Sequence, residues 1–188
     1  MKLSVGQKVA YPNQGACLVE DIERKKIGAQ LMRFYALRVL SDNSMILVPL
    51  ANAAAVGIRP IITTRQYRHL VDKLAADFDE VSSDWKARSR EFSGKLQSGD
   101  VFEAADVLKK LTFLSHEKKL SLREQTFLEK ARFLIVSEVT NAGLAKENRL
   151  ENKINQLIEN ACHKHLITQP QVMEQLRITN VGKSFFNS

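Results

Sequence analysis

The hydrophobic pattern of this chain changes its period once, close to Pro60, and this change constrains the fold more than any other feature. Before it, short runs rich in Val, Ile, Leu, Tyr and Phe alternate with turn residues, which is typical of β-strands. From Thr63 onward, apolar residues recur every three or four positions, which indicates amphipathic helices. The sequence therefore predicts an α+β protein with a β module in residues 1–60 and a helical module in residues 61–166. Residues 167–188 are expected to form a flexible tail.

The β module is expected to be a small antiparallel barrel, because its strands are short and closely spaced. They are predicted at residues 8–11, 16–23, 31–40 and 44–50. Turn chemistry at Pro12 to Gly15 separates the first two strands, and Gly28 allows the bend of a long hairpin between the next two. Residues 51–59 are expected to be a loop. The third strand has apolar residues on both faces, so either the helical module or a partner would cover its outer face.

The helices of the second module are predicted from capping residues that precede apolar stripes. The candidate caps are Thr63 or Thr64, Ser82 to Asp84, Asp100, and Ser121 with Glu124 in the spacing of a capping box. The stripes predict three or four antiparallel helices joined by short turns, which is the pattern of a helical bundle. A further amphipathic helix is predicted at residues 144–162.

Charge and cysteine content narrow the functional classes. Twenty-eight Lys and Arg against 21 Asp and Glu, within 188 residues, give a net charge of +7, which is compatible with nucleic-acid contact without requiring it. Cys17 and Cys162 lie far apart in ordinary globular sequence, so no disulfide framework is indicated. No segment resembles a signal peptide or reaches the roughly 20 apolar residues of a membrane span. We expect a cytoplasmic protein without a membrane partner.

Signals for catalysis are weak, and we expect neither an enzyme nor a cofactor. The sequence has no phosphate-binding glycine loop and no paired acids in an arrangement typical of catalysis. The run from Cys162 to His165 has metal-capable atoms, but its two histidines are two positions apart and do not share a helix face. We therefore expect no metal site. Cys17 is expected to be a small core residue.

Trp85 is the only tryptophan, and cations follow it at Lys86, Arg88, Arg90 and Lys95. Two interpretations are open. The ring packs inside the bundle while the cations form a solvated face, or the ring wedges against an exposed base while the cations hold phosphates. A second basic group would extend such a track; it comprises Lys109, Lys110, Lys118, Lys119 and Arg123. Contacts of this kind are largely independent of base sequence and sensitive to salt.

Several blocks occur in an order that is informative as a set. In the β module they are Val5-Gly6, Val9 to Pro12, Gly15 to Glu20, Ile46 to Pro49 and Asn52 to Arg59; downstream they are Trp85 with its cations, Leu96 to Asp100, Leu120-Ser121 and Lys130 to Arg132. Together these blocks closely resemble the CarD/CdnL family of bacterial transcription regulators. The resemblance covers roughly residues 1–140, and its strength lies in the colinear order of the blocks.

The resemblance implies a specific mechanism. The family's N-terminal module is a Tudor-like (SH3-like) barrel, shared with transcription-repair coupling factors, that binds the β subunit of bacterial RNA polymerase. Its helical module lies against the upstream edge of the promoter bubble, where a tryptophan wedges into the minor groove. By position, Trp85 matches the wedge, and Arg88 and Arg90 match basic residues after it. Lys25 and Ile27 fall on the strand that meets polymerase.

Three positions depart from the family pattern. Ala87 and Gln125 stand where relatives carry a basic DNA-facing residue, and Leu47 stands where a basic polymerase-facing residue can occur. Lys86 or Arg123 would compensate on the DNA side. The predicted DNA-binding residues are Trp85, Lys86, Arg88, Arg90, Lys95 and Arg123, and the predicted polymerase-binding residues are Lys25, Ile27 and Leu47.

The sequence thus predicts a non-catalytic, monomeric transcription regulator that works in the cytoplasm, at the nucleoid. Its partners would be the β subunit of RNA polymerase and promoter DNA, and it would stabilise the open complex by binding the melted state better than the closed one. The alternative is an adaptor of another class, in which the barrel recruits a partner protein and the helices do not bind DNA.

Overall fold

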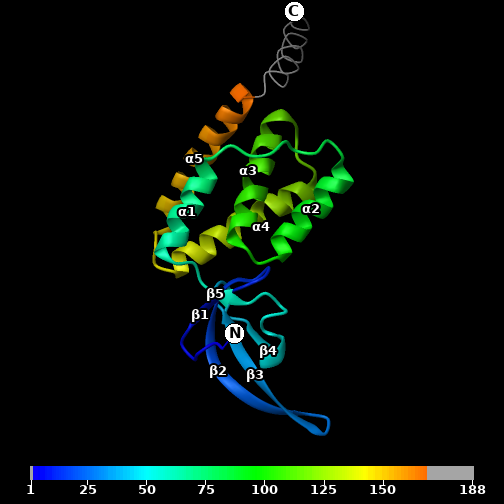
Figure 1. The fold of residues 1–188 in the computed structure, drawn as a ribbon, viewed down its shortest axis with the longest axis vertical. Coiled ribbons are helices and arrows are strands. Elements are labelled where there is room, and N and C mark those ends of the chain that lie inside the picture. Colours follow the sequence, from blue (N-terminus) through cyan, green and yellow to red (C-terminus); the bar gives the residue numbers. More distant parts are fainter. Residues whose placement is uncertain (1, 169–188) are drawn as a thin grey trace, which may run out of the picture.

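The structure is a computed structural model that describes residues 2–168, and it consists of a β module followed by a helical module (Figure 1). The strands are β1 (Lys8–Tyr11), β2 (Gly15–Ile27), β3 (Gln30–Val39), β4 (Met45–Pro49) and β5 (Arg59–Pro60), with a 3-10 helix at Leu50–Asn52. The helices are α1 (Thr64–Ala75), α2 (Trp85–Gln97), α3 (Val101–Glu117), α4 (Leu122–Asn141) and α5 (Glu147–Thr168). The predicted α+β fold, with a small antiparallel β module before a helical bundle, is confirmed.

The five strands form one antiparallel sheet in the order β4-β3-β2-β1-β5. A β-bulge between Val19 and Asp21 interrupts the pairing of β2 with β3 and increases the local twist. Cys17 is buried in the core of this module, as predicted. Strand β5 was not predicted, and the expected loop at 51–59 is corrected accordingly. Two residues are too few for alternation to be recognised.

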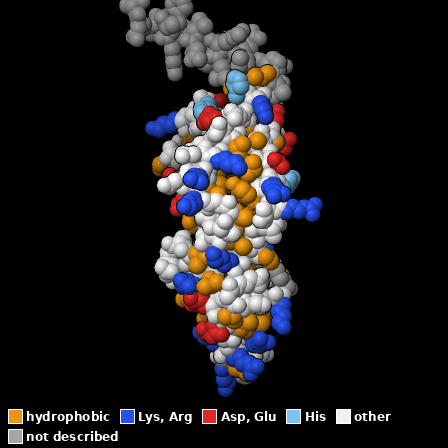
Figure 2. Space-filling view, turned by 90° about the vertical axis from the view of Figure 1, so that its left-hand side faces the viewer, with side chains coloured by type: hydrophobic (Ala, Val, Ile, Leu, Met, Phe, Trp, Pro, Cys, Tyr) orange, Lys and Arg blue, Asp and Glu red, His pale blue; other side chains and the backbone are white. Residues whose placement is uncertain are grey.

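Strands β2 and β3 continue past both of their neighbours. Strand β1 pairs with β2 only as far as Leu18, and β4 pairs with β3 only from Phe34 onward. The remainder is a two-stranded ribbon that projects from the module and turns at Gly28, whose φ is +60° (Figure 1). We refer to residues 24–33 as the ribbon tip. Figure 2 shows Lys and Arg side chains gathered at this end of the molecule.

The helices begin where the capping residues predict. Thr63 and Ser121 each form a capping box, and Asp84 and Asp100 accept hydrogen bonds from the backbone amides two residues later. Helix α5 begins three residues after its predicted start and continues beyond residue 162 to Thr168. Most of the tail predicted at 167–188 lies outside the described residues. Within residues 2–168, each helix is too short or too polar to span a lipid bilayer.

The turn between β1 and β2 is where the β module packs against helix α4 of the helical module. Asn13 has a φ of +64°, and its carbonyl accepts a hydrogen bond from Lys130 Nζ on α4. Ala16 N donates to Ser137 Oγ at 3.1 Å. Gly15, with a φ of +80°, lies so close to α4 that a Cβ there would be 2.7 Å from Ser137 Oγ. A side chain at this position would therefore force Ser137 or the turn to shift.

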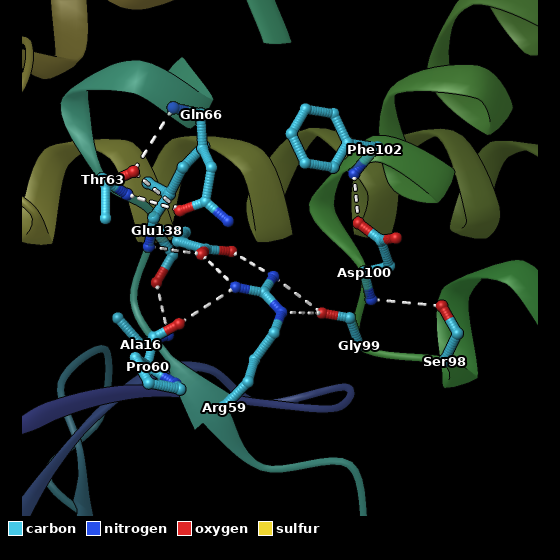
Figure 3. Close-up of polar contacts among 12 residues, drawn as sticks. Ala16, Arg59, Pro60, Thr63, Gln66, Ser98, Gly99, Asp100, Phe102 and Glu138 are labelled. Carbon is cyan, nitrogen blue, oxygen red and sulfur yellow. Dashed lines mark hydrogen bonds and ion pairs between the residues drawn. The ribbon is translucent and has the colours of Figure 1, made fainter. Parts of the chain in front are cut away.

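An ion pair with a buried carboxylate closes the same junction (Figure 3). Glu138 of α4 is only 3% exposed, and its carboxylate accepts two hydrogen bonds from the Arg59 guanidinium, at 2.5 and 2.8 Å. Ile62 N donates to the same carboxylate at 2.8 Å. Arg59 also donates to the carbonyl of Gly99, between α2 and α3, at 2.8 and 3.0 Å. This pair therefore joins the last strand, the start of the helical module, the α2–α3 turn and α4.

The junction predicts different costs for the same substitution at two glycines. Gly99 and Gly143 have similar positive φ values, +75° and +71°, so alanine should strain the backbone equally at both, by about 1 kcal/mol. A Cβ at Gly99 would lie 2.8 Å from Pro12 Cγ, whereas none lies within 4 Å at Gly143. Urea unfolding should show Gly99→Ala to be less stable than Gly143→Ala by about 1–3 kcal/mol. Equal losses would mean that the turn does not press against Gly99.

Candidate nucleic-acid and protein interfaces

Trp85 is the first residue of α2, and its ring is exposed. The Asp84 carboxylate caps the helix by accepting a hydrogen bond from Lys86 N at 2.9 Å. The Trp85 side chain is 61% exposed, and Lys86 Nζ lies 5.9 Å from the centroid of its ring. The interpretation that Trp85 packs inside the bundle is therefore wrong. Trp85 precedes the buried residues of α2, which are Arg88, Phe92 and Leu96. Its ring therefore lies outside the part of the helix that packs into the bundle.

Arg88, predicted to contact DNA, is buried instead. Its side chain is only 3% exposed. The guanidinium donates to Glu124 Oε1 of α4 at 2.7 and 3.1 Å and to the Ser82 carbonyl at 2.5 Å. Its donors are thus used within the protein, where they join the start of α2 to the start of α4. The structure corrects the predicted role, because the guanidinium of Arg88 is committed to partners within the protein and is not available to a phosphate.

Glu124 receives hydrogen bonds from two directions. Its Oε1 atom accepts from Arg88, and Oε2 accepts from Ser121 N at 2.9 Å and Ser121 Oγ at 2.8 Å. Burial alone would raise the pKa of this carboxyl. The hydrogen bonds from Ser121 and Arg88 outweigh burial and lower the pKa from 4.5 to about 2. The carboxylate therefore stays charged at neutral pH, and the brace between α2 and α4 stays intact.

Lys95 is also held within the protein. Its ammonium contacts the carboxylates of Asp106, Glu91 and Glu103, the last two at 3.1 and 3.7 Å. Burial would lower the pKa of Lys95, but the hydrogen bonds to Asp106 and Glu91 raise it above its ordinary value. Lys95 therefore joins α2 to α3, and the structure corrects its predicted role as a phosphate contact.

The second basic group divides in the same way. Lys109 is buried, and its ammonium donates to the Lys73 and Ala76 carbonyls at 2.6 and 3.1 Å, so it caps the end of α1. Lys110 is buried and contacts Glu91 at 3.2 Å. The extended track predicted through these two lysines is therefore wrong. The exposed members of that group are Lys118, Lys119 and Arg123.

Together, Trp85 and the exposed cations border a groove of about 470 Å³ between α2 and the α3–α4 turn. Trp85, Phe92, Leu120 and Phe127 supply its apolar walls, and its rim carries Lys118, Lys119 and Arg123. We refer to this groove, with Lys86 beside it, as the Trp85 surface. The sequence pattern did not reveal Leu120 or Phe127 as groove residues, because an apolar residue on a helical stripe also matches a core position.

The three predicted polymerase-binding residues share one face of the sheet. Lys25 pairs with Met32 of β3, and Leu47 of β4 pairs with Ala36 of β3. Met32 and Ala36 are an even number of residues apart, so their side chains lie on the same face, and their paired partners lie there too. Ile27, two residues after Lys25, has the same orientation. Ile27 is 55% exposed and Leu47 is 40% exposed.

The edges of the sheet are also accessible to a partner strand. Among the described strands, none pairs with β2 beyond Leu18 on the β1 side, where Gly6 and Gln7 bind the backbone of Val19, and none pairs with the outer side of β4. The two edges flank the face that carries Lys25, Ile27 and Leu47. Lys25 contacts Glu23 at 2.9 Å in an exposed pair, which contributes little stability and opens readily. This region therefore offers backbone and side-chain contacts together.

The run from Cys162 to His165 has a structural place in the bundle. His165 stacks on Phe78, with centroids 4.2 Å apart, and its Nδ1 lies 2.7 Å from Asp77 Oδ1. Cys162 is buried, and burial raises its pKa to about 11. Within residues 2–168, no group of three or more His, Cys, Asp or Glu side chains is arranged to hold a metal ion.

Two family models match the chain in tandem. Residues 3–62 match the CarD-like/TRCF RID domain, and residues 69–155 match the CarD C-terminal domain. A protein of Bacillus subtilis (strain 168) with the name "Putative transcription factor YdeB" is 25% identical over 135 residues, which span 72% of this chain and 88% of that protein. The solution NMR structure of the 72-residue N-terminal domain of Myxococcus xanthus CarD is 37% identical, with a TM-score of 0.28, over 31% of this chain and 79% of that one.

The low pKa of Glu124 predicts how the stability of the bundle depends on pH. A carboxyl whose pKa is lower in the folded state stabilises the fold above its unfolded pKa, and this contribution is lost as the pH falls. Urea unfolding should show Glu124→Gln to be less stable than the parent by about 1–3 kcal/mol at neutral pH. The difference should narrow as the pH falls from 4.5 towards 2.

A matched control separates this effect from a general change of charge. Glu129 is an exposed glutamate of the same helix, and Glu129→Gln should leave the free energy of unfolding nearly unchanged. A gap between Glu124→Gln and the parent that stays constant down to pH 2 would contradict the assigned cause.

Proposed function

Because the chain belongs to the CarD family of transcription regulators, we propose that it binds the β subunit of RNA polymerase through residues 1–60 and promoter DNA through residues 61–166. It works in the cytoplasm, at the nucleoid. It acts there without catalysis, as members of this family do. By contacting the upstream edge of the promoter bubble, it stabilises the open complex.

The observation that carries this proposal is the exposed ring of Trp85 above a rigid support. A large aromatic side chain in water is a ready platform for a base, and such stacking contributes roughly 1–3 kcal/mol per base. A ring that keeps two strands apart must also resist being pushed back. The ion pair of Arg88 with Glu124, at 2.7 Å, joins the start of α2, which carries the ring, to the start of α4. This link would give the ring that resistance.

The exposed cations supply the contacts that position the ring. Lys86, Arg90 and Arg123 remain in the proposed DNA-binding set, and Lys118 and Lys119 join it. Their targets are phosphates, so their contribution is independent of base sequence and weakens as salt rises. Arg88 and Lys95 act indirectly, because their ion pairs hold α2 in place. The wedge therefore rests on two charges that do not meet DNA.

The polymerase contact uses the sheet face of Lys25, Ile27 and Leu47 together with the free edge of β2. An edge strand of the β subunit would add to this edge through main-chain hydrogen bonds, while the side chains select the partner. Ile27 and Leu47 supply exposed apolar area, and Lys25 supplies a charge for an acidic group. The departure at Leu47 is then consistent with an interface that depends more on burial at this point than on charge.

The junction gives the two contacts a common effect. Once the β module is bound to polymerase, the Trp85 surface is presented to DNA at a high effective concentration, because the modules are joined by buried contacts. The protein stabilises the open complex if it binds the melted state more tightly than the closed one. A preference of about 1.4 kcal/mol shifts that equilibrium about tenfold.

Replacing the ring tests the wedge. Trp85→Ala should leave polymerase binding unchanged and should abolish most of the increase in the lifetime of open complexes on a ribosomal RNA promoter, measured after addition of a competitor at fixed salt. Leu122→Ala is the matched control, because Leu122 is also a large exposed apolar residue but does not line the groove. If Trp85→Ala prolongs the lifetime as the parent does, the ring is not the wedge. A parent chain that binds polymerase without any effect on the lifetime would be an adaptor instead.

Reversing one charge tests the polymerase face. Lys25→Glu should weaken binding to a fragment of the β subunit by about tenfold, measured by titration calorimetry. Lys26→Glu makes the same change one residue later, where the side chain points to the opposite face, and should have a smaller effect. Equal losses would indicate only general electrostatic attraction, and undiminished binding of Lys25→Glu would place the interface elsewhere.

A further inference from the structure

Helix α5 carries three exposed cations on one flank. Its buried residues Leu150, Ile154 and Ile158 face the bundle. Beside this buried face, exposed polar residues recur at alternating spacings of three and four positions, which places them in one row along the helix. The row consists of Lys146, directly before the helix, followed by Arg149, Lys153, Gln156 and Asn160. We refer to these five residues as the α5 track.

The acidic residues of α5 lie mainly on its other flank. Glu151 lines a groove together with Arg132 of α4, and Glu159 Oε2 lies 3.3 Å from His116 Nε2 of α3. Glu147, at the start of the helix, lines the grooves on both flanks. The charges of α5 are thus separated, with cations along one flank and most carboxylates along the other.

This separation has a cost in helix stability. Arg149 and Lys153 are four positions apart, as are Glu147 and Glu151, so like charges are neighbours in both pairs. Such pairs destabilise a helix, whereas opposite charges at the same spacing stabilise it. Within residues 2–168, none of the three cations of the track forms an ion pair. Their charge is therefore available to an anionic partner.

Helix α1 borders the same surface. A groove of about 790 Å³ lies where α1, the end of α4 and the start of α5 meet. In this groove Lys153 Nζ lies 5.4 Å from the centroid of the Tyr67 ring. Close to Tyr67 in the sequence, α1 exposes Arg65 and Arg68. Figure 2 faces the side of the molecule that carries α1 and α5, and it shows Lys and Arg side chains across the helical module.

The form of the α5 track favours duplex DNA over an acidic segment of a protein. From residue 146 to residue 160 the track is about 21 Å long, because a helix rises 1.5 Å per residue. A helix is narrow enough to lie in the major groove of DNA. Lys, Arg, Asn and Gln are also the side chains that contact phosphates and base edges. Protein interfaces depend instead on apolar or aromatic anchors, and the track has none.

We propose that the α5 track binds duplex DNA, with its three cations on phosphates and its two amides in the groove beside them. This contact goes beyond the one at Trp85. Helices α3 and α4 each pack against both α2 and α5, and they lie between them (Figure 1). A straight duplex cannot meet both sides of the bundle, so the two surfaces bind different segments of DNA. The α5 track needs no melted edge.

Removing two cations tests this contact. The full chain is titrated with a fluorescein-labelled blunt duplex of about 20 base pairs, or two helical turns, which has no melted edge. Lys146→Gln combined with Arg149→Gln should weaken binding about tenfold in fluorescence anisotropy. The slope of log K against log salt should become shallower by about 1.8, because each phosphate contact contributes about 0.9. An unchanged affinity and slope would overturn the proposal.

A matched variant controls for net charge. Arg24→Gln combined with Arg33→Gln also removes two exposed cations, which lie directly opposite each other on the ribbon tip, and it should weaken binding much less. Equal losses would indicate only general attraction and no site on α5. The urea midpoint of the α5 variant should not fall, because the substitutions remove neighbouring like charges. A lower midpoint would mean that these cations serve the fold.

Two further titrations identify the partner and the surface. If a polyglutamate peptide binds more tightly than the duplex and loses more affinity in the α5 variant, the track is a protein site and the DNA proposal is wrong. Trp85→Ala should leave the affinity for the blunt duplex unchanged. If Trp85→Ala abolishes duplex binding and the α5 variant retains it, the chain has one DNA surface and the proposal fails. These titrations contain no polymerase, so their outcome is independent of the open-complex lifetime that tests the proposed function.

Discussion

The buried carboxylate of Glu138 is the group on which the relation between the two modules depends. It accepts hydrogen bonds from the Arg59 guanidinium and from Ile62 N, and Arg59 in turn donates to the Gly99 carbonyl. Loss of one partner from such a site leaves a charge buried without compensation, which costs far more than the pair contributes when complete. The modules are therefore joined cooperatively, and the sheet that carries Lys25, Ile27 and Leu47 is held at a fixed separation from the Trp85 surface. The proposed action on polymerase and DNA together requires this.

Much of the positive charge near Trp85 serves the fold. Arg88 and Lys95 are ion-paired between helices, and Lys109 caps the end of α1. A count of cations along α2 therefore overstates the area available to phosphates. The buried cations nonetheless matter for the proposed function, because their ion pairs hold α2 in place, and α2 carries the exposed ring of Trp85. On the proposed function, charges that do not contact DNA would thus determine how rigidly Trp85 is held.

Local signals predicted most of the fold, because caps and turns act over a few residues. Thr63, Asp84, Asp100 and Ser121 each began a helix as expected. Strand β5 was missed because it has no period. For the candidate site, the uniqueness of Trp85 and the resemblance to a family pointed to one surface, but they did not predict which of its side chains are buried. Arg88 is buried by Glu124, 36 residues away, and no local pattern contains that information.

The charges of the ribbon tip disfavour pairing of its open edge with the same edge of a second copy of the chain. Arg24 lies directly opposite Arg33, and Lys25 and Lys26 follow on the same strand. Like charges across a strand pair destabilise the ribbon slightly. They also repel a second ribbon, because two copies aligned edge to edge would bring both sets of cations together. Unpaired edges are otherwise templates for aggregation. The positive charge thus disfavours pairing of this edge with another copy of the same chain, and it does not disfavour pairing with an acidic or neutral strand.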